Sequence, residues 1–239
     1  VTVTLTPSPG EKLTIDRDIQ FLVEGILIFT DPARRAQMVD LQNNYGWEVL
    51  SHTLTHDRIS LLTADQYEAN CVAYAALAAG YGFTVDNIAY PWGEEGVAAH
   101  WAITARHFMG GFRASNGINK RETQDDYAIH RIPLGSSMTS DMDTLAEFQT
   151  LIDTTKADSR WLVFMLHIAD TDAAGLQLIA DVLDYAIAQG VAIVSPRKGL
   201  AEFGAIVQSG RSSQANQSYF YIRPEGLIHS SRPATGESQ

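Results

Sequence analysis

Two histidines four residues apart, His52 and His56, follow an apolar run that begins at Trp47. On one turn of a helix, side chains four residues apart point the same way, so two imidazole nitrogens could bind one metal ion. The run of Trp, Val and Leu before them is typical of a strand, and an α/β enzyme keeps its chemistry at the carboxyl ends of strands. Because the chain has seven histidines in 239 residues, the spacing alone fits unconnected surface or core histidines equally well.

Two more groups of unusual residues come directly after predicted strands. Tyr90-Pro91-Trp92-Gly93 follows the apolar run 87–89, and His167 follows the run 161–166. In a strand–helix barrel these points converge on one face, so residues far apart in sequence can share a pocket. A metal pair, an aromatic wall and a third histidine suit a hydrolase with a metal-bound water, in which His167 protonates the leaving group.

The elements that must position these residues alternate along the chain. Short β-branched or apolar runs are followed by helical patterns, which predicts a parallel sheet with covering helices. The predicted strands are 1–6, 25–30, 47–50, 87–90, 111–114, 161–166 and 191–194, with a shorter one at 128–133 inside a loop-rich insertion, 115–139. The predicted helices are 11–23, 32–44, 64–81, 95–108, 140–156 and 173–189, and Gly190 is a good C-cap for the last.

Length and composition fit one globular unit with a small appendage. Hydrophobic residues make up 45% of the chain and charged residues 19%, so residues 1–207 can form one α/β domain with a full core. Residues 208–239 are rich in polar residues and contain a β-hairpin pattern around Pro224-Glu225-Gly226. We expect this tail to pack on the barrel, to join a homo-oligomer, or to belong to something larger.

The net charge limits the classes of partner that the protein can bind, and the cysteine content limits its disulfides. The net charge of −11 argues against nucleic acid and against an anionic membrane surface, because both are polyanions, but not against a neutral polysaccharide. No apolar stretch is long enough to span a bilayer. The single cysteine, Cys71, allows no intramolecular disulfide and is expected to be a small buried hydrophobe. Since the chain begins at Val1, a signal peptide or an upstream domain could have preceded it.

Three motifs together resemble the polysaccharide deacetylases of the NodB-homology type, carbohydrate esterase family 4. The stretch from Gly46 to His56 resembles the family's second motif, and Tyr90-Pro91-Trp92-Gly93 resembles the third motif in its Tyr-Pro-aromatic-Gly form. Leu166-His167 resembles the fifth motif. The resemblance covers roughly residues 1–205, and it is the order of the motifs that makes it specific.

The resemblance implies an irregular (β/α) barrel of the NodB type and a role for each motif. His52 and His56 would bind a divalent metal ion, commonly zinc, and His167 would act as general acid. Tyr90, Pro91, Trp92 and Gly93 would line the groove for the sugar. His130 and Arg131 lie near a further motif that supports the general acid, although a structural ion pair of Arg131 is the other interpretation.

The chain departs from the family at the first motif. The family has two adjacent aspartates there, a general base and a metal ligand, but the corresponding stretch, 4–10, holds no carboxylate. The arginine that would hold the base is also absent, since Ile88 and Ala89 precede Tyr90. Asp31 is the best substitute, although it also suits an N-cap before Pro32. Glu94 and Glu95 are alternative carboxylates that would also suit the first turn of a helix.

Two functions are therefore predicted side by side. The first is a metal-dependent hydrolase that removes N- or O-linked acetyl groups from a polysaccharide, with His167 and Asp31 in the catalytic roles. The second is a catalytically impaired, deacetylase-like module that binds carbohydrate within a larger extracellular or viral-fibre-like assembly. Either function would place the protein outside the cell or at its surface.

Overall fold

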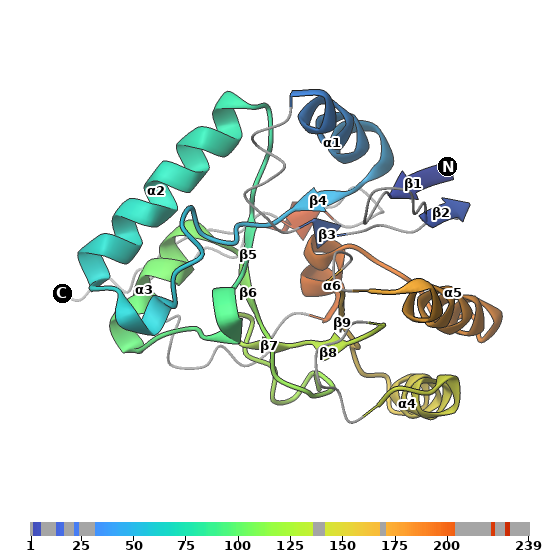
Figure 1. Ribbon diagram of the computed structural model, residues 1–239. Helices are drawn as coiled ribbons and strands as arrows, with labels where there is room; N and C mark the ends of the chain where they lie inside the picture. The colour runs from blue at the N-terminus through green and yellow to red at the C-terminus, as the bar shows by residue number, and fades with distance from the viewer. Residues whose placement is uncertain are drawn as a thin grey trace.

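The computed structural model describes residues 2–5, 13–16, 22–23, 32–135, 142–167, 171–203, 221–222 and 228–229, which form a mixed α/β structure (Figure 1). The helices are α1 (Pro32–Tyr45), α2 (Ala64–Gly80), α3 (Ala98–His107), α4 (Leu145–Ala157), α5 (Ala173–Ala188) and α6 (Pro196–Phe203), with 3₁₀ turns η2 (Ile59–Leu61) and η3 (Pro91–Gly93). The strands are β1 (Thr2–Leu5), β2 (Leu13–Asp16), β3 (Leu22–Val23), β4 (Glu48–Val49), β5 (Asn87–Ala89), β6 (Gly110–Arg113), β7 (Ile129–His130), β8 (Ile132–Pro133), β9 (Phe164–Met165), β10 (Tyr221–Ile222) and β11 (Ile228–His229).

The central strands are parallel and follow the order of the sequence. β3 pairs with β4, and backbone hydrogen bonds of Ser51 with Asn87 and Ala89 continue the order to β5. β5, β6 and β7 pair in turn, and β8 pairs with β9. The carboxyl ends of these strands therefore lie at one edge. No pairing among the described strands joins β9 to β3, so the mixed α/β class is confirmed while the closed barrel stays a prediction.

The predicted strand 128–133 is divided between two neighbours. Its first half, β7, pairs with β6, and its second half, β8, pairs with β9. Arg131 lies at the division and is buried. This short segment therefore continues the parallel order from β6 to β9.

The amino-terminal part differs from the prediction. A helix was expected over 11–23, but β2 and β3 lie there, and β2 pairs antiparallel with β1. Leu13 and Ile15 alternate with Thr14 and Asp16, and this period of two favours a strand once a partner is available. Thr4 and Leu5, where the stretch 4–10 begins, therefore belong to an antiparallel strand rather than to one of the parallel strands, and residues 6–10 lie outside the described residues. The predicted strand 25–30 lies outside the described residues.

The predicted helices after residue 31 are confirmed, with ends set by local caps. Thr63 with Gln66 forms a capping box at α2, and Thr144 with Glu147 forms one at α4. Asp172 caps α5 by accepting a hydrogen bond from the Gly175 amide. Gly190 follows α5 with φ of 70°, as expected for a glycine C-cap.

Three apolar clusters join the helices to the parallel strands, and Figure 1 shows α2 and α3 at the left, α1 above β4, and α4 and α5 at the right. Val49 packs with α1 and α2, Ile88 with α2 and α3, and Ile132 with α4 and α5. A fourth cluster lies on the opposite face of the strands and contains Leu50, Ala89, Phe112, Ile129 and Leu200. Val49 and Leu50, at the end of β4, thus alternate between the helical layer and the inner cluster, as do Ile88 and Ala89 in β5.

Helix α6, which the sequence did not predict, closes the amino ends of the strands. A strand was expected over 191–194, but these residues have no hydrogen-bonded partner strand in the part of the chain that the structure describes, and α6 follows. The amide of Arg197 donates to both oxygens of Glu48, at 2.9 and 3.0 Å. Its guanidinium pairs with Asp86. Since Glu48 begins β4 and Asp86 precedes β5, α6 is fixed at the end opposite to the predicted site.

The carboxyl-terminal tail is described at two short strands only. β10 and β11 pair antiparallel over two residues each. The residues between them and the domain boundary at 207–208 lie outside the described residues, so the hairpin tail stays a prediction. In the described residues, no helix combines the length and the apolar composition that crossing a membrane would require.

Candidate functional site

The two predicted metal ligands, His52 and His56, lie in the loop after β4. Their ring centroids are 4.8 Å apart, with an angle of 61° between the ring planes. The residues between them are not helical, which corrects the expected geometry of a single helical turn. Thr53 and His56 adopt left-handed conformations, with φ of 59° and 58°, and these two residues turn the backbone so that the rings still meet.

Side chains hold this loop in its conformation. Ser51 Oγ accepts a hydrogen bond from the Thr53 amide, and Thr53 Oγ1 accepts one from the His56 amide. Asn70, on α2, accepts a bond from the Leu54 amide at 2.7 Å. A non-glycine residue in the left-handed region costs about 1–3 kcal/mol, and these bonds offset part of that cost.

His52 is oriented by the backbone of the neighbouring strand. Its Nδ1 lies 2.8 Å from the Ala89 carbonyl oxygen, which can only accept a hydrogen bond. Nδ1 therefore carries the proton, and in the neutral ring Nε2 is the atom with a lone pair. An imidazole fixed in this way by a backbone carbonyl is the usual arrangement of a metal-binding histidine.

The histidine pair also meets the distance requirement of a shared ion. Two imidazoles bound to one tetrahedral zinc ion at about 2.1 Å have ring centroids roughly 5 Å apart. The observed 4.8 Å agrees with this value. The ring spacing of His52 and His56 is therefore compatible with a shared zinc ion, and the metal site stays a prediction.

The described residues supply no third donor. They contain no group of three or more His, Cys, Asp or Glu side chains that could hold a metal ion, so His167 does not join the pair as a ligand. Asp31 lies outside the described residues. Glu94 and Glu95 form ion pairs with Arg58 and Arg113 instead.

Trp92 stands beside the histidine pair. Its ring centroid is 5.5 Å from that of His56, and its Nε1 donates to the His56 carbonyl oxygen at 3.1 Å. Its side chain is 58% exposed, a large value for tryptophan. The guanidinium of Arg58 lies 4.7 Å from the indole centroid. An exposed aromatic ring of this kind can stack on the apolar face of a sugar.

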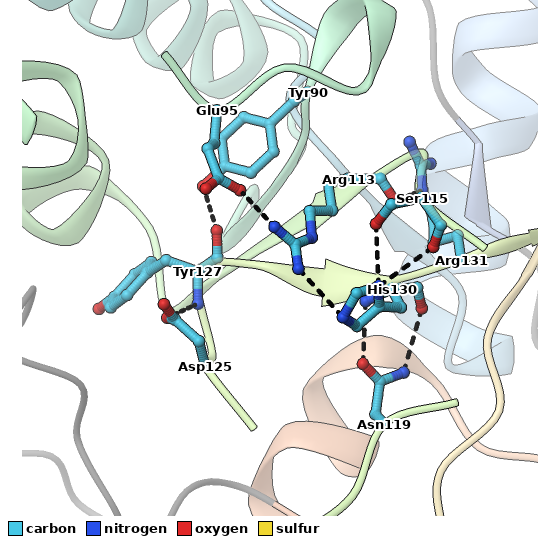
Figure 2. A network of polar contacts seen from close by, with 9 residues as sticks. All are labelled: Tyr90, Glu95, Arg113, Ser115, Asn119, Asp125, Tyr127, His130 and Arg131. Carbon is cyan, nitrogen blue, oxygen red and sulfur yellow. Dashed lines mark hydrogen bonds and ion pairs between the residues drawn. The ribbon is translucent and has the colours of Figure 1, made fainter. Parts of the chain in front are cut away.

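Two of the four residues expected to line the groove are buried instead. Tyr90 is 1% exposed, and its hydroxyl donates to the Tyr127 carbonyl oxygen at 2.8 Å (Figure 2). Pro91 is buried as well. The alternation of the strand continues through Tyr90 and turns its ring into the core below the turn. We therefore correct the expectation for Tyr90 and Pro91, which support the turn rather than line a groove.

Gly93 is required by the backbone of the same turn. Its φ is 71°, and a Cβ built on it would lie 2.6 Å from the Cβ of Ala114. A side chain would therefore be strained both by the left-handed conformation and by the close approach of the chain after β6. Gly93 lets η3 pack closely enough to present Trp92.

His167 follows β9 at the carboxyl edge of the parallel strands, as predicted. It is exposed, and its carbonyl oxygen accepts a hydrogen bond from Thr171 Oγ1 at 2.8 Å. In strand order β9 is four positions from β4, a path of roughly 19 Å along a sheet at about 4.8 Å per strand. Its role as general acid stays a prediction.

A second polar group lies at the carboxyl ends of β6 and β7 (Figure 2). Arg113 donates to His130 Nε2 at 3.0 Å, and His130 Nδ1 faces the hydroxyl and the carbonyl oxygen of Ser115 at 2.9 and 3.2 Å. Because the carbonyl accepts only, Nδ1 carries the proton, and His130 cannot take a proton from Ser115. Burial, and then the Arg113 guanidinium, lower the pKa of His130 from its ordinary value of 6.5.

Arg131 and the remaining histidines have structural contacts. Arg131 is buried, and its Nε donates to the Arg113 carbonyl oxygen at 3.3 Å. His100 is buried between the Val97 amide and the Leu62 carbonyl oxygen. His107 pairs with Glu68 at 2.6 Å. Cys71 is buried, as expected, and burial raises the pKa of its thiol to about 12.

Left-handed backbone is concentrated at the histidine pair. Four non-glycine residues in the described part of the chain have positive φ: Thr53, His56, Trp92 and Ser159. Three of the four lie in the two loops that follow β4 and β5. Strain that the surrounding structure maintains is a recurrent property of functional sites.

No protein-family model matches the chain, and no curated protein sequence does. Several solved structures do. The Xyl-CE4 domain of a multidomain xylanase from the hindgut metagenome of Trinervitermes trinervoides aligns with a TM-score of 0.49 and 11% identity, over 78% of this chain and 79% of that one. A CE4 family pseudoenzyme from Bacillus anthracis aligns with 0.48 and 14%, over 79% of this chain and 56% of that one.

A family 4 carbohydrate esterase from Streptomyces lividans aligns with a TM-score of 0.42 and 17% identity, over 72% of this chain and 78% of that one. The chain resembles this family. The similar structures include both esterases and a pseudoenzyme, and this chain spans little more than half of the pseudoenzyme's length. At such identities and TM-scores, the chemistry proposed below rests on this chain's own residues.

The sequence did not indicate the residues that hold the site together. Arg58, Ser60 and the carbonyl of Ala89 all contact site residues, and only the fold brings them there. Arg58 could have been found from its position two residues after His56, because this loop and the loop of Trp92 follow neighbouring strands.

Proposed function

We propose that the protein is a metal-dependent hydrolase that removes acetyl groups from a polysaccharide or another acetylated glycan. The observation that carries the proposal is the orientation of His52 by the Ala89 carbonyl oxygen, with the His56 ring 4.8 Å away. A structural histidine would not need a neighbour at metal-sharing distance. The pair also lies at the edge of the strands where such folds keep their chemistry.

Each residue would have a distinct task. His52 and His56 would hold the divalent ion, zinc being the first candidate, through lone pairs on neutral rings. When bound, such an ion acts as a Lewis acid toward the acetyl carbonyl and lowers the pKa of its water. His167 would give a proton to the departing amine or alkoxide. Asp31 would complete the ligand set or accept a proton.

Trp92 would bind the glycan beside the histidine pair. Its exposed ring offers an apolar face, and Gly93 and Tyr90 fix the turn that presents it. The net charge of −11 is compatible with a neutral glycan as the substrate. We propose that the protein acts outside the cell or at its surface, where such glycans are accessible, and that the tail could join copies of the chain.

Acetate release from acetylated glycans tests this proposal. We expect zinc-loaded wild type to release acetate and His52→Ala to lose at least about 100-fold in rate, while His107→Ala, a histidine on α3 paired with Glu68, stays near wild type. Because the first-motif aspartates are absent, turnover should be slower by ~10²–10⁴ than with a general base in place. Equal rates for wild type and His52→Ala would refute the proposal.

The second candidate is a glycan-binding module that has lost its chemistry. The observation that favours it is the absence, within the described residues, of a third metal donor. Such a module would bind glycan through Trp92 without needing metal. Glycan binding by chelator-treated protein that Trp92→Ala abolishes, together with no acetate release at any metal concentration, would favour the module over the enzyme.

A further inference from the structure

The two glutamates after η3 bind neighbours on opposite sides of the turn. Glu94 forms an ion pair with Arg58, in the loop after β4. Glu95 lies 3.5 Å from Arg113, at the end of β6. Consecutive carboxylates therefore fix the turn that carries Trp92 between the loop after β4 and the end of β6.

The Glu94 carboxylate is bound through both of its oxygens. One carboxylate oxygen of Glu94 binds Arg58, and the other accepts a hydrogen bond from Ser60 Oγ at 2.7 Å. Arg58 in turn lies over the indole of Trp92, at 4.7 Å from its centroid. A chain of contacts thus runs from Ser60 through Glu94 and Arg58 to the exposed ring beside His56.

We propose that Glu94 is a positioning residue: it holds Arg58 against Trp92 and so fixes the aromatic surface that borders the histidine pair. The proposal deepens the function proposed above and rests on it for the identity of the ligand. Both Glu94 oxygens are engaged away from the histidines, so its task differs from that of a metal ligand. The ligand it serves is a sugar ring stacked on the indole, next to the acetyl group to be removed.

The physical reason is that neither contact of Arg58 is strong alone. A cation–π contact at an exposed site and a surface ion pair each contribute little, and a long arginine side chain loses freedom in either. When Glu94 and Trp92 both bind the guanidinium, the Arg58 side chain loses its conformational entropy only once for two contacts. Removal of the carboxylate should release Arg58 and leave the Trp92 ring more mobile and more accessible.

The test compares Glu94→Gln and Glu94→Ala with a matched control, Glu122→Gln, in which the carboxylate is exposed in a turn. Acrylamide quenching of the Trp92 fluorescence, obtained by subtracting the spectrum of Trp92→Phe, reports on the ring without metal or glycan. Zinc affinity and the kinetic constants for acetate release are measured on the same proteins. Glu94→Gln keeps a hydrogen-bond acceptor but loses the charge, so its effect should lie between wild type and Glu94→Ala.

We expect Glu94→Ala to raise the quenching constant of Trp92 and to raise KM about fivefold, with kcat and zinc affinity within about twofold of wild type. Glu122→Gln should match wild type in every measurement. Unchanged quenching in Glu94→Ala, or a loss of zinc affinity, would overturn the positioning role. If wild type itself releases no acetate, the proposed function fails, while the quenching result still decides the role of Glu94.

Discussion

At their carboxyl ends, β4 and β5 lead into loops that hold His52, His56 and Trp92 in exposed or half-buried positions, and the backbone of His56 and Trp92 is left-handed. At their amino ends, the same two strands are held by α6, whose Arg197 binds Glu48 through its amide and Asp86 through its guanidinium. One end is strained and open to solvent, whereas the other is closed by paired charges over an apolar cluster.

The difference indicates a division of labour along the strands. Leu200 of α6 completes the inner cluster with Phe112 and Ile129, so the amino end contributes burial. Burial also raises the pKa of Glu48, although Ser195, Arg197 and Asn87 bind the carboxylate and oppose the shift. At the carboxyl end, strained left-handed backbone orients the rings of His56 and Trp92. Binding and catalytic groups are commonly placed on loops that a stable scaffold supports.

The largest effect is expected at the amino end. Leu200→Ala removes a side chain that is 6% exposed from the inner cluster, and such a cavity costs about 2–5 kcal/mol of unfolding free energy. Urea unfolding measures this loss, and zinc affinity should stay near wild type. Leu61→Ala is the matched control, because Leu61 is 77% exposed. Equal losses in the two variants would mean that α6 does not close the core.

A smaller effect, but one on the site itself, is expected at the turn of Trp92. Gly93→Ala forces a side chain into left-handed backbone at 2.6 Å from Ala114 Cβ, which should cost roughly 2 kcal/mol and displace Trp92. Chemical unfolding measures the loss of stability, and the fluorescence of Trp92 reports the displacement of its ring. Gly80→Ala is the control, since a Cβ there meets nothing within 4 Å. Unchanged Trp92 fluorescence in Gly93→Ala would contradict the account.

The smallest effect is expected on the pH dependence of stability, through the protonation of His130. Because burial and Arg113 lower its pKa in the folded state, the unfolded chain takes up the proton more readily. Stability should therefore fall as the pH drops below about 6.5. The slope of the unfolding free energy between pH 8 and pH 5.5 measures this loss, and it should be shallower in His130→Gln. An identical slope in both proteins would show that His130 does not cause the pH dependence of the unfolding free energy.

Most of the element order could be predicted from the sequence. Apolar periodicity located α1 to α5, and the capping residues Thr63, Thr144 and Asp172 mark helix starts that local chemistry determines. The failures lie where tertiary partners decide. The stretch 13–16 becomes a strand because β1 pairs with it, and 191–194 finds no partner strand among the described elements.

The site was predicted in its residues but not in its geometry. Spacing found His52 and His56, yet it implied a helical turn, whereas Thr53 and His56 turn the chain through left-handed backbone. The motif found Trp92 but could not separate it from the buried Tyr90, because burial depends on which face of β5 meets the core. The Ala89 carbonyl and Arg58 became visible only once the strands were side by side.

Zinc titration of the metal-free protein tests the central claim, that the two histidines after β4 share an ion, most directly. We expect wild type to bind one zinc ion per chain, and His52→Ala and His56→Ala each to weaken binding by more than about 100-fold, since each removes one of few ligands. His107→Ala should bind as wild type does. Zinc binding that survives both substitutions, or its absence from wild type, would contradict the account.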